Sequence, residues 1–377
     1  MLEEVAAVRI GCPQPHLLTV SGLGAWRWEC FYALLAPAVF DCPGYKRECN
    51  RKARGLSSIL GKKIIVFRPG ALGDTLLAFP ALAALRRAFP TARLSVVGNA
   101  PALALARDAG LVDEVASFDL PHWAELFAEA GIRSAEARQA LAGASLAVLW
   151  LRDSEGQAAR NLRALGISTI VSAPGRPPEG ARLHAAEYLL GTLASIIGAD
   201  ALAPAPALTL KPSDEANAWA DGEWARRGLV GRSVLALHPG SGGRAKCWPP
   251  ERFAALADGF IAAGWRVLVI EGPADGLAVR QTLALLPADA TQAVAGVTLP
   301  QLAGLLARAT LCVGNDSGVT HLSAMLGAPT LALFGPTDPV IWRPLGPRVR
   351  VVWPGAVAPM AALSAAEVAH AAQMLLG

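Results

Sequence analysis

Short apolar runs alternate with amphipathic stretches along most of this chain, starting at Lys63. In the first half the apolar runs are "KIIVF" (63–67), "RLSVV" (93–97) and "SLAVLW" (145–150), and helices are expected at 81–89, 101–109 and 183–197. Unbroken apolar runs of this length are typical of strands in a parallel sheet that is covered on both faces. The pattern therefore predicts a doubly wound α/β domain.

The same alternation restarts after residues 198–214, a segment of low charge with three prolines that we interpret as a domain linker. Strands are expected at 233–238, 266–270, 311–315 and 329–335, and helices at 250–263, 274–286, 300–309, 318–326 and 361–376. The chain thus reads as α/β, with two Rossmann-like doubly wound domains facing a cleft. We expect the domains at 63–205 and 206–360, followed by a C-terminal helix (361–377) that could pack across both.

Residues 1–62 lack this pattern and are interpreted as an N-terminal extension. They contain four of the six cysteines (Cys12, Cys30, Cys42 and Cys49), whose spacings match no zinc motif, so no metal site is expected. The extension is a loosely ordered arm, the product of a mis-assigned start codon, or a membrane-surface contact. In the last case the apolar residues 31–40 enter the interface and the basic run at 46–54 meets anionic headgroups.

Composition and charge narrow the classes of function. Hydrophobic residues make up 53% of the chain, and the net charge is only +4, from 34 basic and 30 acidic residues. No basic stripe with interleaved aromatic residues is present, so nucleic-acid binding is not expected. The N-terminus has acids where an export signal needs positive charge, and no apolar run reaches the ~18 residues of a membrane span. A cytoplasmic location follows, with a peripheral contact at the inner membrane left open.

A first candidate site lies in "RPGALGDTLLAFP" (68–80), where a strand is followed by a helix. Ligands of open α/β sheets bind beyond the carboxyl ends of the strands, and glycines there let the backbone approach a ligand closely. Asp74 is either a helix cap or a catalytic residue, and the two roles are compatible. Because Pro80 would interrupt a continuous helix, residues 74–79 are expected to be irregular. The glycine spacing does not match a dinucleotide fingerprint.

A second candidate site is the glycine-rich loop in "HPGSGGRAKCWPPERF" (238–253). Glycines, a hydroxyl and a lysine between a strand and a helix favour a phosphate-type anion. Lys246 would supply a point charge for a leaving diphosphate. We interpret Trp248 as a packing anchor.

A third candidate site is "VGNDSGVTHLSAMLGAPTLALFGPTDP" (313–339), where a strand ends and a helix opens near Gly318. The amides and dipole of that helix would face an anion. Asp316 is either a cap or an acceptor of hydrogen bonds from a sugar or from the loop, and His321 is either a packing residue or a ligand contact. In "VIEGPAD" (269–275), Glu271 or Asp275 could accept the two hydroxyls of a ribose, and the residues do not choose between them.

Taken together, these motifs predict a diphosphate site and a ribose acid in the second domain, and a lone acid in the first. That arrangement suits a nucleotide-activated donor and a general base. The three long motifs, in this order over about residues 63–345, resemble glycosyltransferase family 9, the lipopolysaccharide heptosyltransferases. The resemblance implies a GT-B fold and inverting transfer of a heptose or related sugar from an ADP-type nucleotide sugar. It also implies a lipopolysaccharide-core or other cell-envelope glycan acceptor.

The resemblance also assigns roles by position. Asp74 matches the catalytic base, beside Gly73, and we place Arg68 and Gly73 on the acceptor side. The residues that match donor contacts are Ser241, Gly242, Lys246, Val297, Asp316, Ser317, Gly318 and His321. Glu271 is added to the nucleotide site as the candidate ribose acid. No tightly bound cofactor and no metal are implied, since helix amides and a lysine would stabilise the leaving diphosphate.

One position departs from the family pattern. The best-known heptosyltransferases carry a histidine three residues after the catalytic aspartate, and this chain has Leu77 there, which puts the acceptor and the sugar in doubt. Two other functions stay open from the sequence. One is a noncatalytic nucleotide-sugar-binding or regulatory protein, and the other is a sugar-nucleotide epimerase of the same fold.

Overall fold

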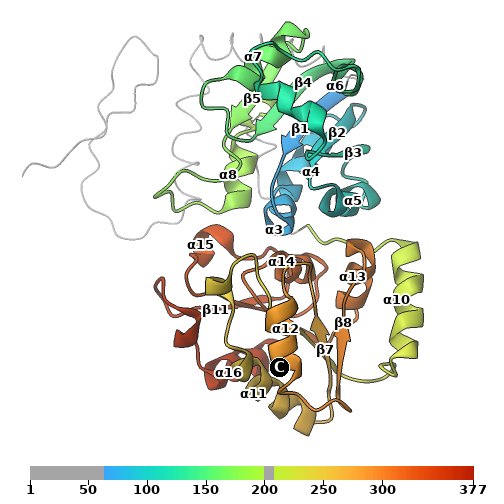
Figure 1. The fold of residues 1–377 in the computed structure, drawn as a ribbon, viewed down its shortest axis with the longest axis vertical. Coiled ribbons are helices and arrows are strands. Elements are labelled where there is room, and N and C mark those ends of the chain that lie inside the picture. The colour runs from blue at the N-terminus through green and yellow to red at the C-terminus, as the bar shows by residue number, and fades with distance from the viewer. Residues whose placement is uncertain (1–62, 199–207) are drawn as a thin grey trace, which may run out of the picture. The chain divides into compact units, whose positions relative to one another are not determined.

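The computed structural model describes residues 63–198 and 208–377. The extension expected at 1–62, with its cysteines and basic run, and the domain boundary expected at 205/206 lie outside these residues. Within them, two parallel sheets form (Figure 1).

The first sheet has the strand order β3-β2-β1-β4-β5. Its strands are β1 (Lys63–Arg68), β2 (Arg93–Gly98), β3 (Glu114–Ser117), β4 (Ala144–Trp150) and β5 (Thr169–Ala173). The second sheet has the order β11-β10-β9-β6-β7-β8. Its strands are β6 (Val234–His238), β7 (Arg266–Ile270), β8 (Thr291–Val294), β9 (Leu311–Asn315), β10 (Thr330–Leu333) and β11 (Val349–Val352). The predicted pair of doubly wound domains is confirmed.

Helices connect the strands of each sheet. The first domain contains α3 (Leu72–Leu76), α4 (Phe79–Ala88), α5 (Ala100–Asp108), η1 (Pro121–Phe127), α6 (Ala135–Leu141), α7 (Gln157–Ala164), α8 (Ala185–Gly191) and α9 (Ala194–Ile197). The second contains α10 (Asp214–Arg226), η3 (Arg244–Lys246), α11 (Pro250–Ala262), α12 (Gly276–Leu283), α13 (Leu299–Leu306), α14 (Gly318–Met325), α15 (Pro339–Trp342), η4 (Met360–Ala362) and α16 (Ala365–Leu376). No helix among the described residues is long and apolar enough to cross a membrane.

The central strands β1, β4, β6 and β9 are almost completely buried, which explains the continuous apolar runs in the sequence. The largest apolar core joins side chains of both sheets, including Ile64 and Val66 of β1 and Val234 and Ala236 of β6. The carboxyl ends of β1, β6, β7 and β9 are each followed by one of the motifs singled out above.

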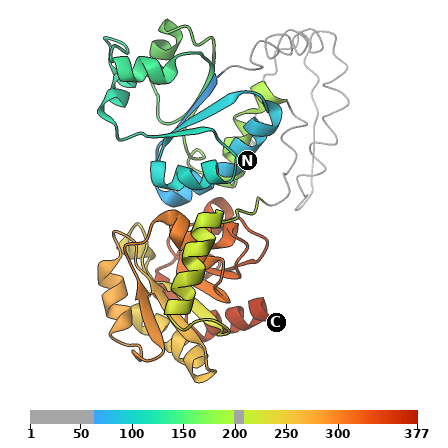
Figure 2. The same cartoon turned by 90° about the vertical axis from the view of Figure 1, so that its right-hand side faces the viewer.

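Two helical segments differ from the sequence expectation. The helix expected at 183–197 is divided into α8 and α9 around Thr192, whose hydroxyl donates to the carbonyl oxygen of Leu189 at 2.6 Å. Such bonding back to the preceding turn competes with the helical ladder. The residues expected to form the end of the linker instead lead into α10, which begins after the N-cap Ser213 and packs beside α13 (Figure 2).

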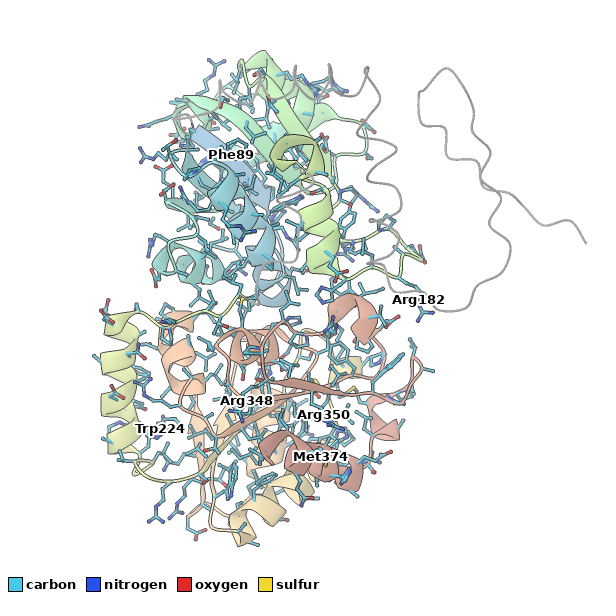
Figure 3. The ribbon with its side chains drawn as sticks, turned by 180° about the vertical axis from the view of Figure 1, so that it is seen from behind. Phe89, Arg182, Trp224, Arg348, Arg350 and Met374 are labelled. Atoms are coloured by element: carbon cyan, nitrogen blue, oxygen red, sulfur yellow. The ribbon has the colours of Figure 1, made fainter. Side chains whose placement is uncertain are left out.

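Helix α10 buries only a narrow face of small residues and Trp224. Figure 3 shows Trp224 on this helix. The final helix begins at Ala365, and Ser364 and Glu367 form a capping box at its start. It packs against α11, β10 and β11, so its buried side chains belong to the core of the second domain.

Candidate active site

Asp74 lies inside the short helix α3, at its third residue, and is not the N-cap. Ala71 is the N-cap, and its backbone N–H donates to Oδ2 of Asp74 at 3.4 Å. The expectation that residues 74–79 are irregular is confirmed only for Leu77 and Ala78, which form a turn between the end of α3 at Leu76 and the start of α4 at Phe79. Pro80 falls in the first turn of α4, where its missing N–H costs no hydrogen bond.

The turn before α3 requires glycine and brings Asp74 close to Arg68. Gly70 has φ +146°, and a Cβ there would lie 3.0 Å from Cβ of Asp74. Nη2 of Arg68 donates to the carbonyl oxygen of Asp74 at 2.8 Å and lies 3.5 Å from Oδ1 of its carboxylate. The Asp74 side chain is 33% exposed, whereas that of Arg68 is 5% exposed. Arg68 therefore lies behind the carboxylate and leaves it open to solvent.

The glycine-rich loop after β6 is tied to the start of α14 through Asn315. The Nδ2 amide of this buried residue donates to the carbonyl oxygens of Pro239 at 2.9 Å and Gly240 at 3.1 Å. Its Oδ1 accepts from the backbone N–H of Trp248 at 3.0 Å. Trp248 is fully buried and donates through Nε1 to the carbonyl oxygen of Leu363, which supports its interpretation as a packing anchor.

Asp316 is the centre of a buried charge cluster. Its Oδ2 accepts from Nζ of Lys246 at 2.8 Å and from the hydroxyl of Thr337 at 2.9 Å, and Nε2 of His321 lies 3.8 Å from Oδ1. Burial alone would raise the pKa of Asp316, but the contacts with His321 and Lys246 outweigh it and lower that pKa to about 2. The hydroxyl of Ser241 donates to the Asp316 carbonyl oxygen at 2.8 Å.

This cluster decides one of the alternatives left by the sequence and shows a partner for Lys246. Asp316 is not a helix cap, because Ser317 is the N-cap of α14 and accepts from the N–H of Thr320 at 3.4 Å. Lys246, expected to supply a point charge for a leaving diphosphate, is bound to Asp316, which lies 70 residues further along the chain. Thr337, which the sequence did not single out, belongs to the cluster because the turn after β10 lies beside the end of β9.

Helices α3 and α14 are in contact at glycines of the first and third motifs. A Cβ on Gly73 would lie 3.3 Å from Cδ2 of His321, and a Cβ on Gly318 would lie 2.6 Å from Cβ of Leu72. Gly73, expected on the acceptor side, therefore packs against the second domain. The close approach places the residue next to Asp74 against the first turn of α14.

The two candidate ribose acids have different surroundings. Asp275 is buried and accepts from the backbone N–H of Gly272 at 3.0 Å, and its Oδ2 lies 2.9 Å from Nε2 of His238. Burial would raise the pKa of Asp275, but these hydrogen bonds lower it below its usual value. Glu271 is half-buried, and no hydrogen bond to its carboxylate is found among the described residues. Glu271 is therefore the one of these two acids whose carboxylate has unused hydrogen-bond acceptor capacity.

A buried hydrogen-bond chain, which the sequence did not reveal, runs beneath the loop. Nδ1 of His238 lies 2.9 Å from Oγ of Ser317, which lies 3.0 Å from Oγ1 of Thr320. Thr320 donates to the carbonyl oxygen of Asn315 at 2.6 Å. Gly240 is required here, because a Cβ would lie 2.0 Å from Cγ of Asp275. In the sequence, a histidine at the end of a predicted buried strand, His238, was the signal that could have pointed to this hydrogen-bond chain.

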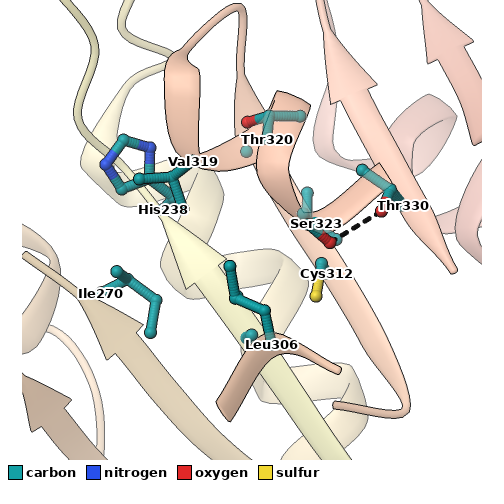
Figure 4. A pocket seen from close by; sticks show the side chains of 11 residues that line it. His238, Ile270, Leu306, Cys312, Val319, Thr320, Ser323 and Thr330 are labelled. Atoms are coloured by element: carbon teal, nitrogen blue, oxygen red, sulfur yellow. Dashed lines mark hydrogen bonds between the residues drawn. The ribbon is translucent and has the colours of Figure 1, made fainter. Parts of the chain in front are cut away.

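The interior beside this chain has no room for a nucleotide. A cavity of about 10 Å³ lies here. Its lining includes His238, Cys312 and Thr320 (Figure 4). That volume corresponds to about one water molecule. Val297 is half-buried in the turn between β8 and α13 and packs against the core. No group of His, Cys, Asp and Glu side chains in the described parts of the chain is arranged to hold a metal ion.

Comparisons with known proteins agree with this architecture. The crystal structure of the glycosyl transferase family 9 from Veillonella parvula DSM 2008 matches with a TM-score of 0.71 and 22% identity, over 84% of this chain and 98% of that one. The Escherichia coli ADP-heptose lps heptosyltransferase II matches with a TM-score of 0.67 and 23% identity, over 83% and 98% of the two chains. The GT-B fold is thereby confirmed.

Sequence relatives carry related names. The chain is 34% identical over 129 residues to lipopolysaccharide heptosyltransferase 3 of Escherichia coli, covering 33% of this chain and 38% of that protein. It is 32% identical over 152 residues to lipooligosaccharide heptosyltransferase 2 of Haemophilus influenzae, covering 39% and 44%. These matches span about two-fifths of the length of each relative.

The family model described as glycosyltransferase family 9 (heptosyltransferase) matches residues 179–370, just over half of the chain. That stretch contains the Gly-rich loop, the Asp316 cluster and the hydrogen-bond chain below them. We conclude that this protein belongs to glycosyltransferase family 9.

Proposed function

We propose that this protein is an inverting glycosyltransferase. It moves a heptose or a related sugar from an ADP-type nucleotide sugar to a lipopolysaccharide-core or other cell-envelope glycan. The observation that carries the proposal is the contact of Gly73 with His321, because it brings the partly exposed Asp74 next to the first turn of α14. A base and an anion site then lie together, as glycosyl transfer requires.

The second domain binds the donor. Its diphosphate lies at the amides of the first turn of α14 and the loop at Ser241 and Gly242, and Lys246 supplies a positive charge. Lys246 turns from Asp316 toward the diphosphate, while Thr337 and His321 keep Asp316 satisfied. Glu271 accepts the ribose hydroxyls, and Val297 packs near the adenine.

Asp74 acts as the general base. It removes the proton from the acceptor hydroxyl as that oxygen attacks the anomeric carbon, and the nucleoside diphosphate leaves on the opposite face of the sugar. Arg68 fixes the backbone of Asp74 and lies close to its carboxylate, so its role is to position the base. Burial lowers the pKa of Arg68, although Asp74 acts in the opposite direction.

The acceptor is a glycan or glycolipid of the cell envelope, and the protein works in the cytoplasm, in peripheral contact with the inner membrane. Leu77 occupies the position of the family histidine, but it is 1% exposed and packs with Ala185 and Ala186. That position therefore contributes packing in this protein, and the acceptor is selected elsewhere.

Acceptor-dependent release of ADP from ADP-heptose, measured with a panel of core-oligosaccharide acceptors, tests the proposal. We expect release with a competent acceptor, and we expect Asp74→Asn to lower turnover by about 10²–10⁴-fold while ADP still binds. Near-normal turnover of the variant would exclude Asp74 as the base. ADP binding without turnover on any acceptor would indicate a binding protein, and an isomerised sugar formed from donor alone would indicate an epimerase.

A further inference from the structure

In the hydrogen-bond chain beneath the glycine-rich loop after β6, the protons on His238 decide which groups donate and which accept. Four side chains form it: Asp275, His238, Ser317 and Thr320, and all are at most 8% exposed. The successive contacts are 2.9, 2.9 and 3.0 Å long, and the chain ends on the Asn315 carbonyl oxygen at 2.6 Å from Oγ1 of Thr320. Each contact needs one hydrogen between its two polar atoms.

Two hydrogens are fixed by their surroundings. A carbonyl oxygen can only accept, so the hydroxyl of Thr320 donates to Asn315 and cannot donate to Ser317. Asp275 accepts from a backbone N–H of Gly272, and its pKa is lowered, so its carboxylate is ionised and Nε2–H of His238 donates to it. What remains is the hydrogen between His238 and Ser317.

If Nδ1 of His238 lacked a proton, the single hydroxyl hydrogen of Ser317 would have to point at that nitrogen. The oxygens of Ser317 and Thr320, 3.0 Å apart, would then face each other without a hydrogen between them. With a proton on Nδ1, His238 donates to Ser317, and the Ser317 hydroxyl hydrogen lies between Ser317 and Thr320. It can turn from Thr320 to a bound anion, because a charged oxygen is a stronger acceptor than a hydroxyl. Buried polar groups are rarely left unmatched, so the second arrangement is favoured.

We propose that His238 carries protons on both ring nitrogens, is paired with Asp275, and acts through Ser317 as a positioning residue for the nucleotide diphosphate. This inference rests on the proposed function, which places the diphosphate at the first turn of α14. The doubly protonated histidine cancels the charge of Asp275 below an anionic ligand, and it leaves the Ser317 hydroxyl as a donor. Loss of the Nδ1 proton would turn that hydroxyl away and restore a net negative charge.

Other ionisable side chains lie on the elements around His238. They are Glu271 after β7, whose carboxylate has no hydrogen-bond partner among the described residues, Lys246 and Cys247 in the loop after β6, Cys312 of β9, and Asp316 and His321 around the start of α14. Asp316 pairs with Lys246 and lies near His321. Burial raises the pKa of the Cys247 thiol, and it raises that of Cys312 to about 12. Asp275 is therefore the charge in direct contact with His238.

Two substitutions test the roles of the two ring nitrogens of His238 separately. In His238→Asn the side-chain amide lies near the position of Nδ1 and can donate to Ser317 without titrating. In His238→Gln the amide reaches the position of Nε2 and leaves Ser317 without a donor. A merely structural role would make the smaller asparagine the more damaging change, whereas the proposal makes glutamine more damaging for ADP binding.

Calorimetric titration of the full chain with ADP between pH 6 and 9, in buffers of different ionisation enthalpy, tests this. We expect wild-type affinity to fall as the pH rises and ADP binding to take up protons. His238→Gln should lower affinity by about ten- to a hundredfold, the range for a hydrogen bond that involves a charged group. His238→Asn should recover much of that loss and lack the wild-type pH dependence. Titration of ADP itself is common to all three proteins and cancels in the comparison.

The outcomes distinguish this inference from the proposed function. If the wild-type protein does not bind ADP, the proposed function fails. If ADP binds but wild type and His238→Asn show the same pH dependence and proton uptake, the second proton on His238 is excluded. A larger loss in asparagine than in glutamine, with both variants folded by circular dichroism, would likewise overturn the positioning role.

Discussion

Lys246 is held in place before any ligand arrives. Its Nζ lies 2.8 Å from Oδ2 of Asp316, and the side chain is 36% exposed, so it can exchange this partner for a phosphate oxygen without crossing the protein interior. When it leaves, Asp316 retains the Thr337 hydroxyl and its contact with His321. At the residue scale, the pair thus supplies a lysine that is already close to the diphosphate.

Lys246→Ala should weaken ADP binding by roughly 1.5–3 kcal/mol, because it removes a charge-assisted hydrogen bond to the diphosphate. Adenosine, which lacks phosphates, should bind almost unchanged, and turnover should fall further because charge on the leaving group grows in the transition state. Arg232→Ala, which removes an exposed charge just before the amino end of β6, is the matched control. Equal losses for ADP and adenosine in calorimetry would show that Lys246 is not the phosphate contact.

At the scale of helices and strands, the sequence predicted the strands whose residues are almost all buried, on both faces of the sheet. Strands β3, β5, β8 and β11 were not predicted. Each is a short strand at or next to a sheet edge, and its partly exposed face mixes Glu, Gln, Arg, Ser or Thr with apolar residues. Helix α10 was not predicted for a related reason, since its buried face is narrow and consists largely of alanine.

The individual residues of the candidate site were predicted from the sequence, but their pairings were not. Local motifs identified Asp74, Lys246 and the Asp316 segment, because glycines and a helix start have local signatures. The pairing of Lys246 with Asp316 and of His238 with Asp275 and Ser317 depends on which strands become neighbours. In the structure β6 lies between β7 and β9, and that order brings the three loops together.

Helix α8 begins with an unusual cap that makes stability depend on pH. Nδ1 of His184 accepts from the N–H of Ala186 at 3.3 Å, so the ring is neutral and its Nε2–H donates to the carbonyl oxygen of Arg343 at 2.9 Å. Burial lowers the pKa of His184 from 6.5 to about 4. Because the folded pKa is the lower one, the unfolded chain binds more protons between these values.

Stability should therefore be fully present above about pH 6.5 and should fall as the pH drops toward 4, by roughly 3 kcal/mol for this group. His184→Asn keeps a preferred N-cap residue but does not titrate, so this part of the loss should disappear. Urea unfolding at pH 7, 6, 5 and 4 measures both proteins. Parallel stability curves for wild type and His184→Asn would show that His184 is not the group responsible.

For the molecule as a whole, the two domains share interior packing. All described residues fall within one compact unit, and the largest apolar core contains side chains of both sheets. The contact between α3 and α14 and the bond from His184 to Arg343 add polar and close-packed links between the domains. Unfolding of one domain would expose apolar surface of the other, which favours a single cooperative transition.

We therefore predict that the chain unfolds in one calorimetric transition and that ADP raises its midpoint. A ligand present at 100 times its dissociation constant stabilises the native state by about 2.7 kcal/mol. Because the packing is shared, ADP bound to the second domain should also slow amide hydrogen exchange in β1 and α3 of the first. Adenosine at the same multiple of its dissociation constant is the control for the phosphate contribution. Two transitions, of which ADP moves only one, would show that the domains unfold independently and that donor binding does not stabilise the helix that carries Asp74.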